Sequence, residues 1–437
     1  MSGKTSFASV LIAAASYTGT GLAQAAPSAS KLTTLYTFTG LAPTGEMAHD
    51  ATGALYGAAA DGEDGRGAVF QLTPPTASGS GWTASTIYSF GPAPDGYDPY
   101  STGLVFDGHG RLYGTTSNGG NSPFGDLGTV FQLTPPAVAG GAWTETVIHS
   151  FAGGTDGANP MSQPVFGRDG TLYGTTFNGG GTVCQGEGCG TVFALQPPLA
   201  EGAGWTEKIL YAFAESGDDG SGPFGTLLLG KDDALYGITE TRATAGGGYV
   251  FQVKPPKSGM GAWTETVLSQ VTMDDFNRNN PVGLTFGKDG SLYGTTNADG
   301  DMGAGSVFVL KPPAAPGEAW AQTVLYSFGA AGDGAYPPSG VVLGPNGTLY
   351  GTTAGGGANG FGTIYRMDPP KAAGGSWTET VLYSFTDGSD AAVPRRSYCG
   401  RPRRALRKHQ QLPHIRHAVP LHPITATARG PTVVLLA

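Results

Sequence analysis

The motif Leu112-Tyr113-Gly114-Thr115-Thr116, called the repeated phrase below, decides the fold because it recurs throughout the chain. The same five residues stand at 172–176, 292–296 and 349–353, and shorter versions stand at 55–57 and 235–237. The six leucines of the phrase are 57 to 63 residues apart. A recurring interval of this size is typical of repeat architectures, in which each unit packs against its neighbours.

Each repeat reads as four short strands. Between Gly103 and Phe151, strand-like runs occur at 104–106, 112–116, 129–133 and 143–151. Pro135-Pro136 ends the third run, because proline has no N–H to donate to a sheet. The 74 Gly and 32 Pro residues of the 437-residue chain also disfavour helices. The pattern predicts an all-β protein, a β-propeller of four-stranded antiparallel blades, with six complete blades in residues 32–393.

Every tryptophan of the chain stands at the start of a predicted fourth strand: Trp82, Trp143, Trp205, Trp263, Trp320 and Trp377. One ring per repeat at a constant position favours packing between neighbouring blades over a carbohydrate-stacking platform.

The two ends of the chain differ from the repeats. Residues 1–25 have the order of a secretory signal peptide: one Lys, an apolar stretch and small residues ending Ala23-Gln24-Ala25. The alternative is a disordered N-terminus. No other stretch is apolar over the length that spans a bilayer. The sequence therefore predicts an exported, soluble protein that is secreted or stays at the cell surface.

Residues 32–38 carry a lone copy of the fourth-strand phrase, Leu35-Tyr36-Thr37-Phe38, before the first full repeat. An isolated fourth strand at the N-terminus can complete the last blade and so close the ring, which removes open sheet edges.

Residues 394–437 break the pattern. They contain nine Lys or Arg, no Asp or Glu and four of the seven His, whereas residues 1–393 have 15 basic and 33 acidic residues. A basic tail can indicate binding to nucleic acid or to an anionic surface. The next Leu-Tyr-Gly is due near residue 406, however, and codons for Ala405-Leu406-Arg407-Lys408 can encode Leu-Tyr-Gly one nucleotide later. We favour a seventh blade lost to a frameshift and predict no nucleic-acid partner.

The linked phrases Gly-x-Leu-Tyr-Gly-Thr-Thr, Gly-Thr-Val-Phe-x-Leu-x-Pro-Pro and Trp-Thr-Glu-Thr-Val-Leu-Tyr-Ser-Phe resemble the GloVer tandem repeats of bacterial choice-of-anchor exported proteins. The resemblance covers residues 32–393. It implies an exported, propeller-like repeat protein, often anchored at the surface through a C-terminal segment, and it implies no catalytic residues. No such anchor can be read at the C-terminus of this chain.

Candidate ligand-binding residues lie in two classes of loop that should open on one face of the propeller. Loops from a fourth strand to the next blade carry Asp-Gly-x-x-Pro or a relative of it, with the aspartates Asp95, Asp156, Asp219 and Asp333. A ring of carboxylates around the channel could bind a sugar or a calcium ion. The alternative is that each aspartate caps its own turn by accepting hydrogen bonds from nearby backbone N–H groups.

Loops from the second to the third strand are rich in Gly and Asn and contain further weak candidates, Asn118, Asn178, Asp299 and Asp301. These loops match neither a phosphate-binding loop nor an EF-hand. One of them contains Cys184 and Cys189, which we expect to form a local disulfide in an exported protein. Zinc is the weaker interpretation, because no second Cys pair or nearby His completes a tetrahedral set.

Linear catalytic motifs are absent, and we expect no cofactor. His49, His109 and His149 lie in different repeats, and His149 stands where other repeats have Tyr. The sequence favours a monomeric, non-catalytic extracellular protein that binds a glycan or a protein, or acts as a scaffold, through acidic, Gly-rich loops. One alternative is a polysaccharide hydrolase or lyase with two of the four loop aspartates as acid and base. Another is a purely structural surface repeat.

Overall fold

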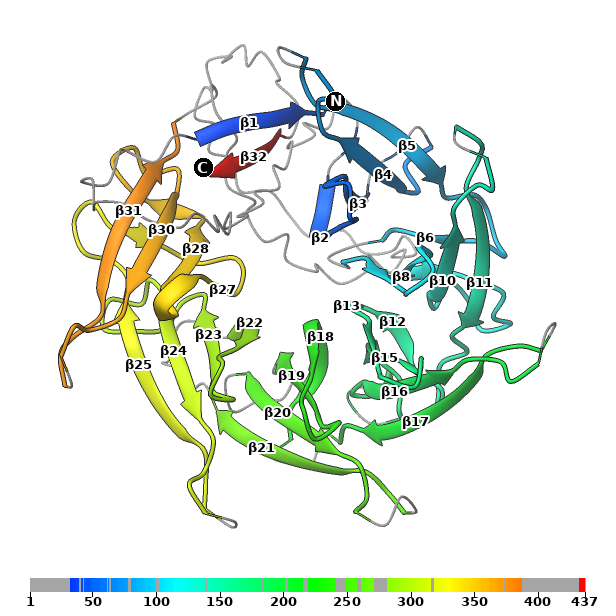
Figure 1. Cartoon of the computed structure of the whole chain (residues 1–437). Helices are drawn as coiled ribbons and strands as arrows, with labels where there is room; N and C mark the ends of the chain where they lie inside the picture. Colours follow the sequence, from blue (N-terminus) through cyan, green and yellow to red (C-terminus); the bar gives the residue numbers. More distant parts are fainter. Residues whose placement is uncertain are drawn as a thin grey trace, which may run out of the picture.

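Six antiparallel sheets stand in a ring, with one sheet edge toward the centre and the other at the circumference (Figure 1). The structure is a computed structural model that describes residues 32–386, apart from interior gaps of which the longest are 241–247 and 271–280, and residues 432–436. The predicted all-β propeller with six blades of mostly four strands is therefore confirmed.

Each blade runs outward from its first strand to its fourth. Blade 1 is β2 (Pro43–His49), β3 (Leu55–Ala59), β4 (Ala68–Thr73) and β5 (Thr83–Ser89). Blade 2 is β7 (Val105–Phe106), β8 (Leu112–Thr116), β10 (Thr129–Thr134) and β11 (Thr144–Ser150). Blade 3 is β14 (Val165–Phe166), β15 (Leu172–Asn178), β16 (Thr191–Gln196) and β17 (Thr206–Ala212), and β12 (Ala158–Pro160) also pairs with β15.

Blade 4 is β18 (Ser221–Leu229), β19 (Leu235–Glu240), β20 (Tyr249–Lys254) and β21 (Thr264–Gln270), with β13 (Ser162–Gln163) parallel to β18. Blade 5 is β22 (Pro281–Phe286), β23 (Leu292–Thr296), β24 (Ser306–Lys311) and β25 (Ala321–Ser327). Blade 6 is β27 (Val342–Leu343), β28 (Leu349–Thr353), β30 (Thr363–Asp368) and β31 (Thr378–Ser384). A 3-10 turn, η1 (Pro345–Gly347), joins β27 to β28.

Each residue of the repeated phrase has a packing role. In blade 2, Leu112 is fully buried, and a Cβ added to Gly114 would lie 2.7 Å from the Cζ atom of Phe131 on the third strand. Glycine is therefore required where the aromatic ring crosses the second strand. Thr116 and Thr129 share a buried hydroxyl hydrogen bond of 2.8 Å, which satisfies both polar groups inside the blade.

The tyrosine of the phrase joins neighbouring blades. Tyr113 of blade 2 packs edge-on against Trp205 of blade 3, with ring centroids 5.9 Å apart, and against Phe166 at 5.0 Å. Tyr56, Tyr173, Tyr236 and Tyr293 make the same kind of contact with the tryptophan of the following blade. The interpretation of the tryptophans as blade-to-blade packing is confirmed.

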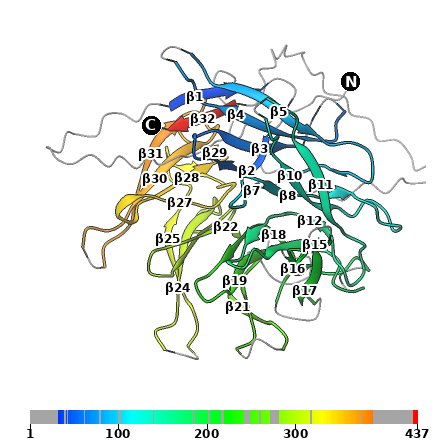
Figure 2. The ribbon, with the colours of Figure 1, turned by 45° about the vertical axis from the view of Figure 1, so that its right-hand side comes forward.

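A two-stranded sheet stands between blade 6 and blade 1 (Figures 1 and 2). It pairs β1 (Leu32–Thr37) antiparallel with β32 (Thr432–Leu436). Phe38, which directly follows β1, is buried against Phe70 of blade 1 with ring centroids 4.7 Å apart, as Phe90 packs on Phe131 at the next interface. Phe38 thus packs on blade 1 as Phe90 packs on blade 2, while β1 itself pairs with β32. Closure of the ring by residues 32–38 stays a prediction.

Several expectations concern residues outside the described part of the chain. The predicted signal peptide, residues 1–25, lies there, and so does the basic tail apart from β32. Among the described residues, the structure contains no helix long and apolar enough to cross a membrane.

Candidate functional site at the blade interfaces

The four loop aspartates lie at blade interfaces near the circumference of the ring. Each follows a fourth strand and accepts a hydrogen bond from a backbone N–H of its own loop. The donor and acceptor residues are Gly91 and Asp95 (2.6 Å), Ala152 and Asp156 (2.5 Å), Ala214 and Asp219 (3.3 Å), and Gly329 and Asp333 (3.1 Å). The turn-capping alternative therefore describes these residues.

At three of these interfaces a tyrosine of the fourth strand also donates its hydroxyl to the aspartate. The pairs are Tyr88 and Asp95 (2.8 Å), Tyr211 and Asp219 (2.7 Å), and Tyr326 and Asp333 (3.1 Å). Burial and the aspartate charge raise the pKa of all three tyrosines, so each remains a hydrogen-bond donor at neutral pH.

Each aspartate also faces a glutamate on the fourth strand of the next blade. These glutamates are Glu145 on β11, Glu207 on β17, Glu265 on β21 and Glu379 on β31. Burial, and then the charge of the neighbouring aspartate, raises the pKa of Glu145, Glu265 and Glu379 to about 7. Two carboxyl groups in one desolvated site cannot both ionise freely, so the glutamate tends to stay neutral.

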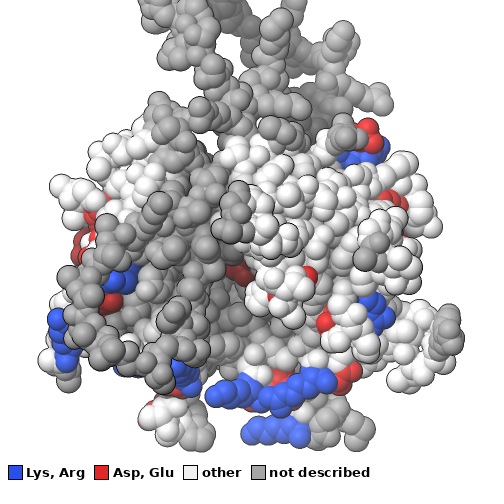
Figure 3. All heavy atoms as spheres, turned by 45° about the horizontal axis from the view of Figure 1, so that its top comes forward, with Lys and Arg blue, Asp and Glu red and all other residues white. Residues whose placement is uncertain are grey.

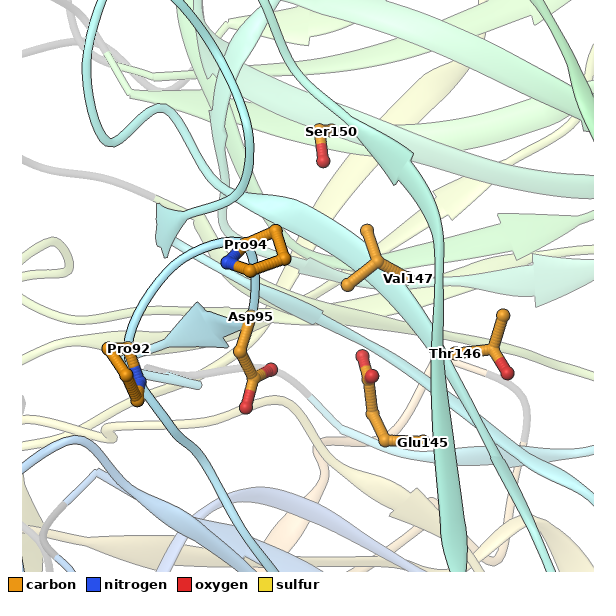
Figure 4. Close-up of a pocket in the computed structure, with 7 residues that line it drawn as sticks. All are labelled: Pro92, Pro94, Asp95, Glu145, Thr146, Val147 and Ser150. Atoms are coloured by element: carbon orange, nitrogen blue, oxygen red, sulfur yellow. The ribbon is translucent and has the colours of Figure 1, made fainter.

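Figure 4 shows this arrangement between blades 1 and 2, where the carboxyl groups of Asp95 and Glu145 point toward one another. They line a cavity of about 460 Å³ together with Pro92, Pro94, Thr146, Val147 and Ser150. A carboxyl group with a raised pKa beside a second carboxyl group is an arrangement that acid–base catalysis can use. The same pair recurs at three further interfaces, however, so its first role is to join blades.

The interface between blades 4 and 5 departs from the pattern. Ser269 stands in the place of the tyrosine and Gln322 in the place of the glutamate, and their side chains form a hydrogen bond. This pair joins the two blades without a carboxyl group among the described residues of the contact.

The interface between blades 2 and 3 departs in another way, because His149 replaces the tyrosine. Its Nε2 atom lies 3.3 Å from Oδ1 of Asp156 and 3.7 Å from Oε1 of Glu207. Burial, then the contact with Asp156, raises the pKa of Glu207 to about 9, whereas contacts with His149, Glu207 and the backbone lower the pKa of Asp156. Asp156 is therefore the ionised member of the carboxyl pair at neutral pH.

The two loop classes meet on one face, as predicted. β6 (Gly96–Tyr97) pairs with β9 (Asn118–Gly119), and β26 (Gly334–Ala335) pairs with β29 (Gly355–Gly356). Asn118 donates its side-chain amide to Asp98, and Asn178 donates to Asn159, so both asparagines hold the two loop classes together. Asp299 is half-buried and Asp301 is exposed. A calcium ion at these loops stays a prediction.

Backbone hydrogen bonds of 2.7 Å connect these loops to loops of the preceding blade. The N–H of the fourth residue of each Asp-Gly-x-x-Pro phrase donates to a carbonyl of the preceding blade: Asp98 to Arg66, Asn159 to Leu127, Gly222 to Cys189 and Tyr336 to Ala304. The donor residue has φ between 54° and 63° in all four loops. These four bonds tie each of these loops to the preceding blade.

Cys184 and Cys189 form the expected disulfide, with their Cα atoms 5.3 Å apart. The bridge closes the loop between β15 and β16, and both sulfur-bearing side chains pack in the core shared by blades 3 and 4.

Sequence reasoning did not single out the four glutamates or the pairing of His149 with two carboxyl groups. The signal was available, because Trp-Thr-Glu-Thr-Val recurs and its Glu is the one charged residue of the phrase. The residue that faces this glutamate lies in another blade. Its identity depends on the relative position of the two neighbouring blades, which the repeat sequence does not give.

Comparison with known proteins places the chain in a family. A model of the Gloeobacter/Verrucomicrobia repeat matches residues 12–186 and 181–403. The chain belongs to this repeat family. The predicted resemblance to GloVer repeats is thus confirmed, and the interface residues described above are properties of this chain's Gloeobacter/Verrucomicrobia repeats. No curated protein matches the chain.

Three solved structures are similar to this chain. A catalytically inactive virginiamycin B lyase from Staphylococcus aureus is 16% identical, with a TM-score of 0.47, over 81% of this chain and 89% of that one. A polysaccharide lyase of family PL25, an ulvan lyase, is 10% identical, with a TM-score of 0.43, over 78% and 82%. PorZ from Porphyromonas gingivalis is 16% identical, with a TM-score of 0.36, over 76% and 40%.

Proposed function

We propose that this protein is a non-catalytic, extracytoplasmic propeller that binds a glycan through the face formed by its two loop classes. The proposal rests on the backbone hydrogen bonds that connect each loop to the preceding blade and so favour a rigid binding surface. Rigid loops lose little conformational entropy when they bind a ligand. The disulfide between Cys184 and Cys189 supports an oxidising, extracytoplasmic location and, with it, export by residues 1–25.

Aromatic side chains on this face suit a sugar better than the carboxyl groups do. Tyr336 and Phe361 are exposed and flank the β26–β29 pair: Tyr336 directly follows β26, and Phe361 bridges to Gly356 of β29. Amphipathic rings can stack on the apolar face of a sugar ring. Charged residues are only 13% of the chain, and Figure 3 shows a group of Lys and Arg side chains at the lower edge of the view, with other charged side chains around the rim. Exposed rings combined with an excess of acidic over basic residues favour a neutral glycan over an anionic one.

Binding to a panel of immobilised polysaccharides tests the proposal. We expect a specific signal that the substitutions Tyr336→Ala and Phe361→Ala reduce about tenfold or more, which corresponds to about 1.4 kcal/mol of binding free energy. Leu199→Ala is the matched control, because Leu199 is fully exposed between β16 and β17, where the chain turns at the opposite face. Equal loss from all three variants, or no specific signal, contradicts the proposal.

The second candidate, a polysaccharide hydrolase or lyase, rests on the cavity between Asp95 and Glu145 and on the raised pKa of Glu145. No two of the four loop aspartates share this cavity. Asp95 lines it, and Asp156, Asp219 and Asp333 each lie at a different interface. An enzyme would therefore use an aspartate with a glutamate of the next blade.

We also propose that the gene encodes the rest of a seventh blade out of frame. An arginine codon of the form CGN becomes GNN one nucleotide later, which encodes Gly, Ala, Val, Asp or Glu, so a frameshifted Gly-rich repeat becomes Arg-rich. Codons for residues 396–409 can in this way encode Gly-Leu-Ile-Val-Asp-Gly-His-Gly-Ala-Leu-Tyr-Gly-Ser-Thr. This string has the spacing of residues 103–116. The position of the β1–β32 pair between blade 6 and blade 1 is compatible with this proposal.

The nucleotide sequence tests this second proposal. Leu-Tyr-Gly in the shifted frame requires T, A and G as the third bases of codons 405, 406 and 407. Any other base at these places contradicts a frameshift of this kind.

A further inference from the structure

One of the four interfaces with a carboxyl pair differs from the other three in a way that changes its chemistry. Tyr88, Tyr211 and Tyr326 each donate a hydrogen bond to the loop aspartate, and a phenol at neutral pH is a poor metal ligand. His149 occupies the same position on β11 and presents an imidazole nitrogen to the same two carboxyl groups. Imidazole and carboxylate together are common ligands of zinc.

The separations fit a single ion. Ligand atoms of Asp156, Glu207 and His149 all lie within 4.8 Å of one another. Bonds of 2.0–2.2 Å at tetrahedral angles place two zinc ligands about 3.3–3.6 Å apart. The Nε2 atom of His149 is 3.3 Å from Oδ1 of Asp156 and 3.7 Å from Oε1 of Glu207, so only small side-chain shifts are needed.

Two of the three ligand atoms are shielded from solvent. Nε2 of His149 and Oε1 of Glu207 make no well-formed hydrogen bond with the described residues; their contacts are the 3.3 Å from Nε2 to Oδ1 of Asp156 and the 3.7 Å between the two atoms themselves. The side chains of His149 and Glu207 are 19% and 16% exposed. Buried polar atoms held only by such long contacts are costly, and a bound ion would satisfy both of them together.

We propose that His149, Asp156 and Glu207 form a site for one divalent transition-metal ion, with Zn²⁺ the best fit. His149 and Asp156 come from the end of blade 2, and Glu207 comes from β17 of blade 3, so the ion joins two blades. Three protein ligands leave a fourth position for water or for an oxygen atom of a ligand. The nitrogen ligand argues against calcium and magnesium, which prefer oxygen donors.

The competing interpretation is an ion pair between a protonated imidazole and the two carboxyl groups. In that case the interface needs no metal, and added zinc should change nothing at this place. Both interpretations leave the fold intact, so a comparison of metal content separates them.

Calorimetric titration of the full chain with ZnCl₂ after treatment with a chelator tests the proposal. His149→Tyr is the matched variant, because it installs the residue found at three equivalent interfaces and should fold. The tail carries four histidines that can also bind zinc. The quantity that decides is therefore the difference between the two proteins: we expect the wild type to bind one ion more per chain.

Two further measurements accompany the titration. Zinc should raise the melting temperature of the wild type more than that of the His149→Tyr variant, because an ion that binds only the folded protein stabilises it. Cobalt(II) in place of zinc should give the visible absorption of a tetrahedral site in the wild type alone. Equal zinc stoichiometry in the two proteins overturns the proposal.

Discussion

At the scale of single residues, the carboxyl pairs give the blade interfaces a predictable dependence on pH. Glu145, Glu265 and Glu379 have a pKa of about 7 in the folded protein, against an ordinary value of 4.5. Between these two values the folded protein keeps a proton that the unfolded chain releases. The stabilisation is therefore complete below about pH 4.5 and is lost as the pH rises through about 7.

We predict that the triple variant Glu145→Gln, Glu265→Gln and Glu379→Gln unfolds with a weaker dependence on pH. Glutamine keeps the shape of the neutral acid and cannot ionise, so the melting temperature should fall less between pH 5 and pH 8 than it does in the wild type. Thermal unfolding across this range is the measurement. Parallel curves for the two proteins would show that these groups do not titrate as described.

A second prediction at this scale transfers the proposed metal site. Tyr88→His places an imidazole beside Asp95 and Glu145, the pair equivalent to Asp156 and Glu207. We expect this variant to bind one zinc ion more than the wild type, measured by the same titration. No gain would show that the two interfaces are not geometrically equivalent.

Single residues also show where sequence reasoning ends. The disulfide between Cys184 and Cys189 was predictable, because the two cysteines are close in sequence and lie in one loop. The partners of Glu145 and Glu207 were not, because they lie in another blade. The aspartates were expected around the channel as one of two alternatives, and their hydrogen bonds instead hold their own turns and tyrosines of the outermost strands.

At the scale of elements, we expect residues 32–38, which include β1, to help close the ring. Phe38 is 2% exposed and packs against Phe70, and Leu35 and Tyr36 contact the same cluster. This contact fills the outer side of blade 1, which would otherwise be open to water.

We predict that Phe38→Ala destabilises the protein by about 3 to 5 kcal/mol, because a buried phenylalanine side chain is replaced by a cavity. Deletion of residues 32–38 should lower the melting temperature further. Phe124→Ala is the control, since Phe124 is exposed in the loop between β8 and β10 and should change stability by less than about 0.5 kcal/mol. Equal melting temperatures for Phe38→Ala and the control would rule out a closing role for this segment.

The strand bounds were predictable at this scale for a simple reason. A run such as 112–116 is defined by its own residues: a glycine that fits under Phe131 and a threonine that pairs with Thr129. The short loop strands β6, β9, β26 and β29 were not predicted, because they have only two residues each and form through pairing between two separate loops.

At the scale of the whole molecule, the repeat explains both the fold and the absence of a single obvious site. Similar interfaces place the carboxyl pairs at several points around the ring, and each pair lies between two blades. A few residues differ from the repeat pattern, among them His149, and Tyr336 and Phe361 are exposed aromatic residues. Function in a propeller of this kind is expected at the departures rather than in the repeated phrases.

Turnover is the most direct test of the central claim that the carboxyl pairs are architecture and that the protein binds without catalysis. The intact chain is incubated with a panel of polysaccharides, and products are followed as new reducing ends and as the ultraviolet absorbance of unsaturated ends. We expect no product above buffer from the wild type or from Asp95→Asn, alongside measurable glycan binding. Product formation by the wild type that Asp95→Asn abolishes, in a variant that still folds, would contradict it.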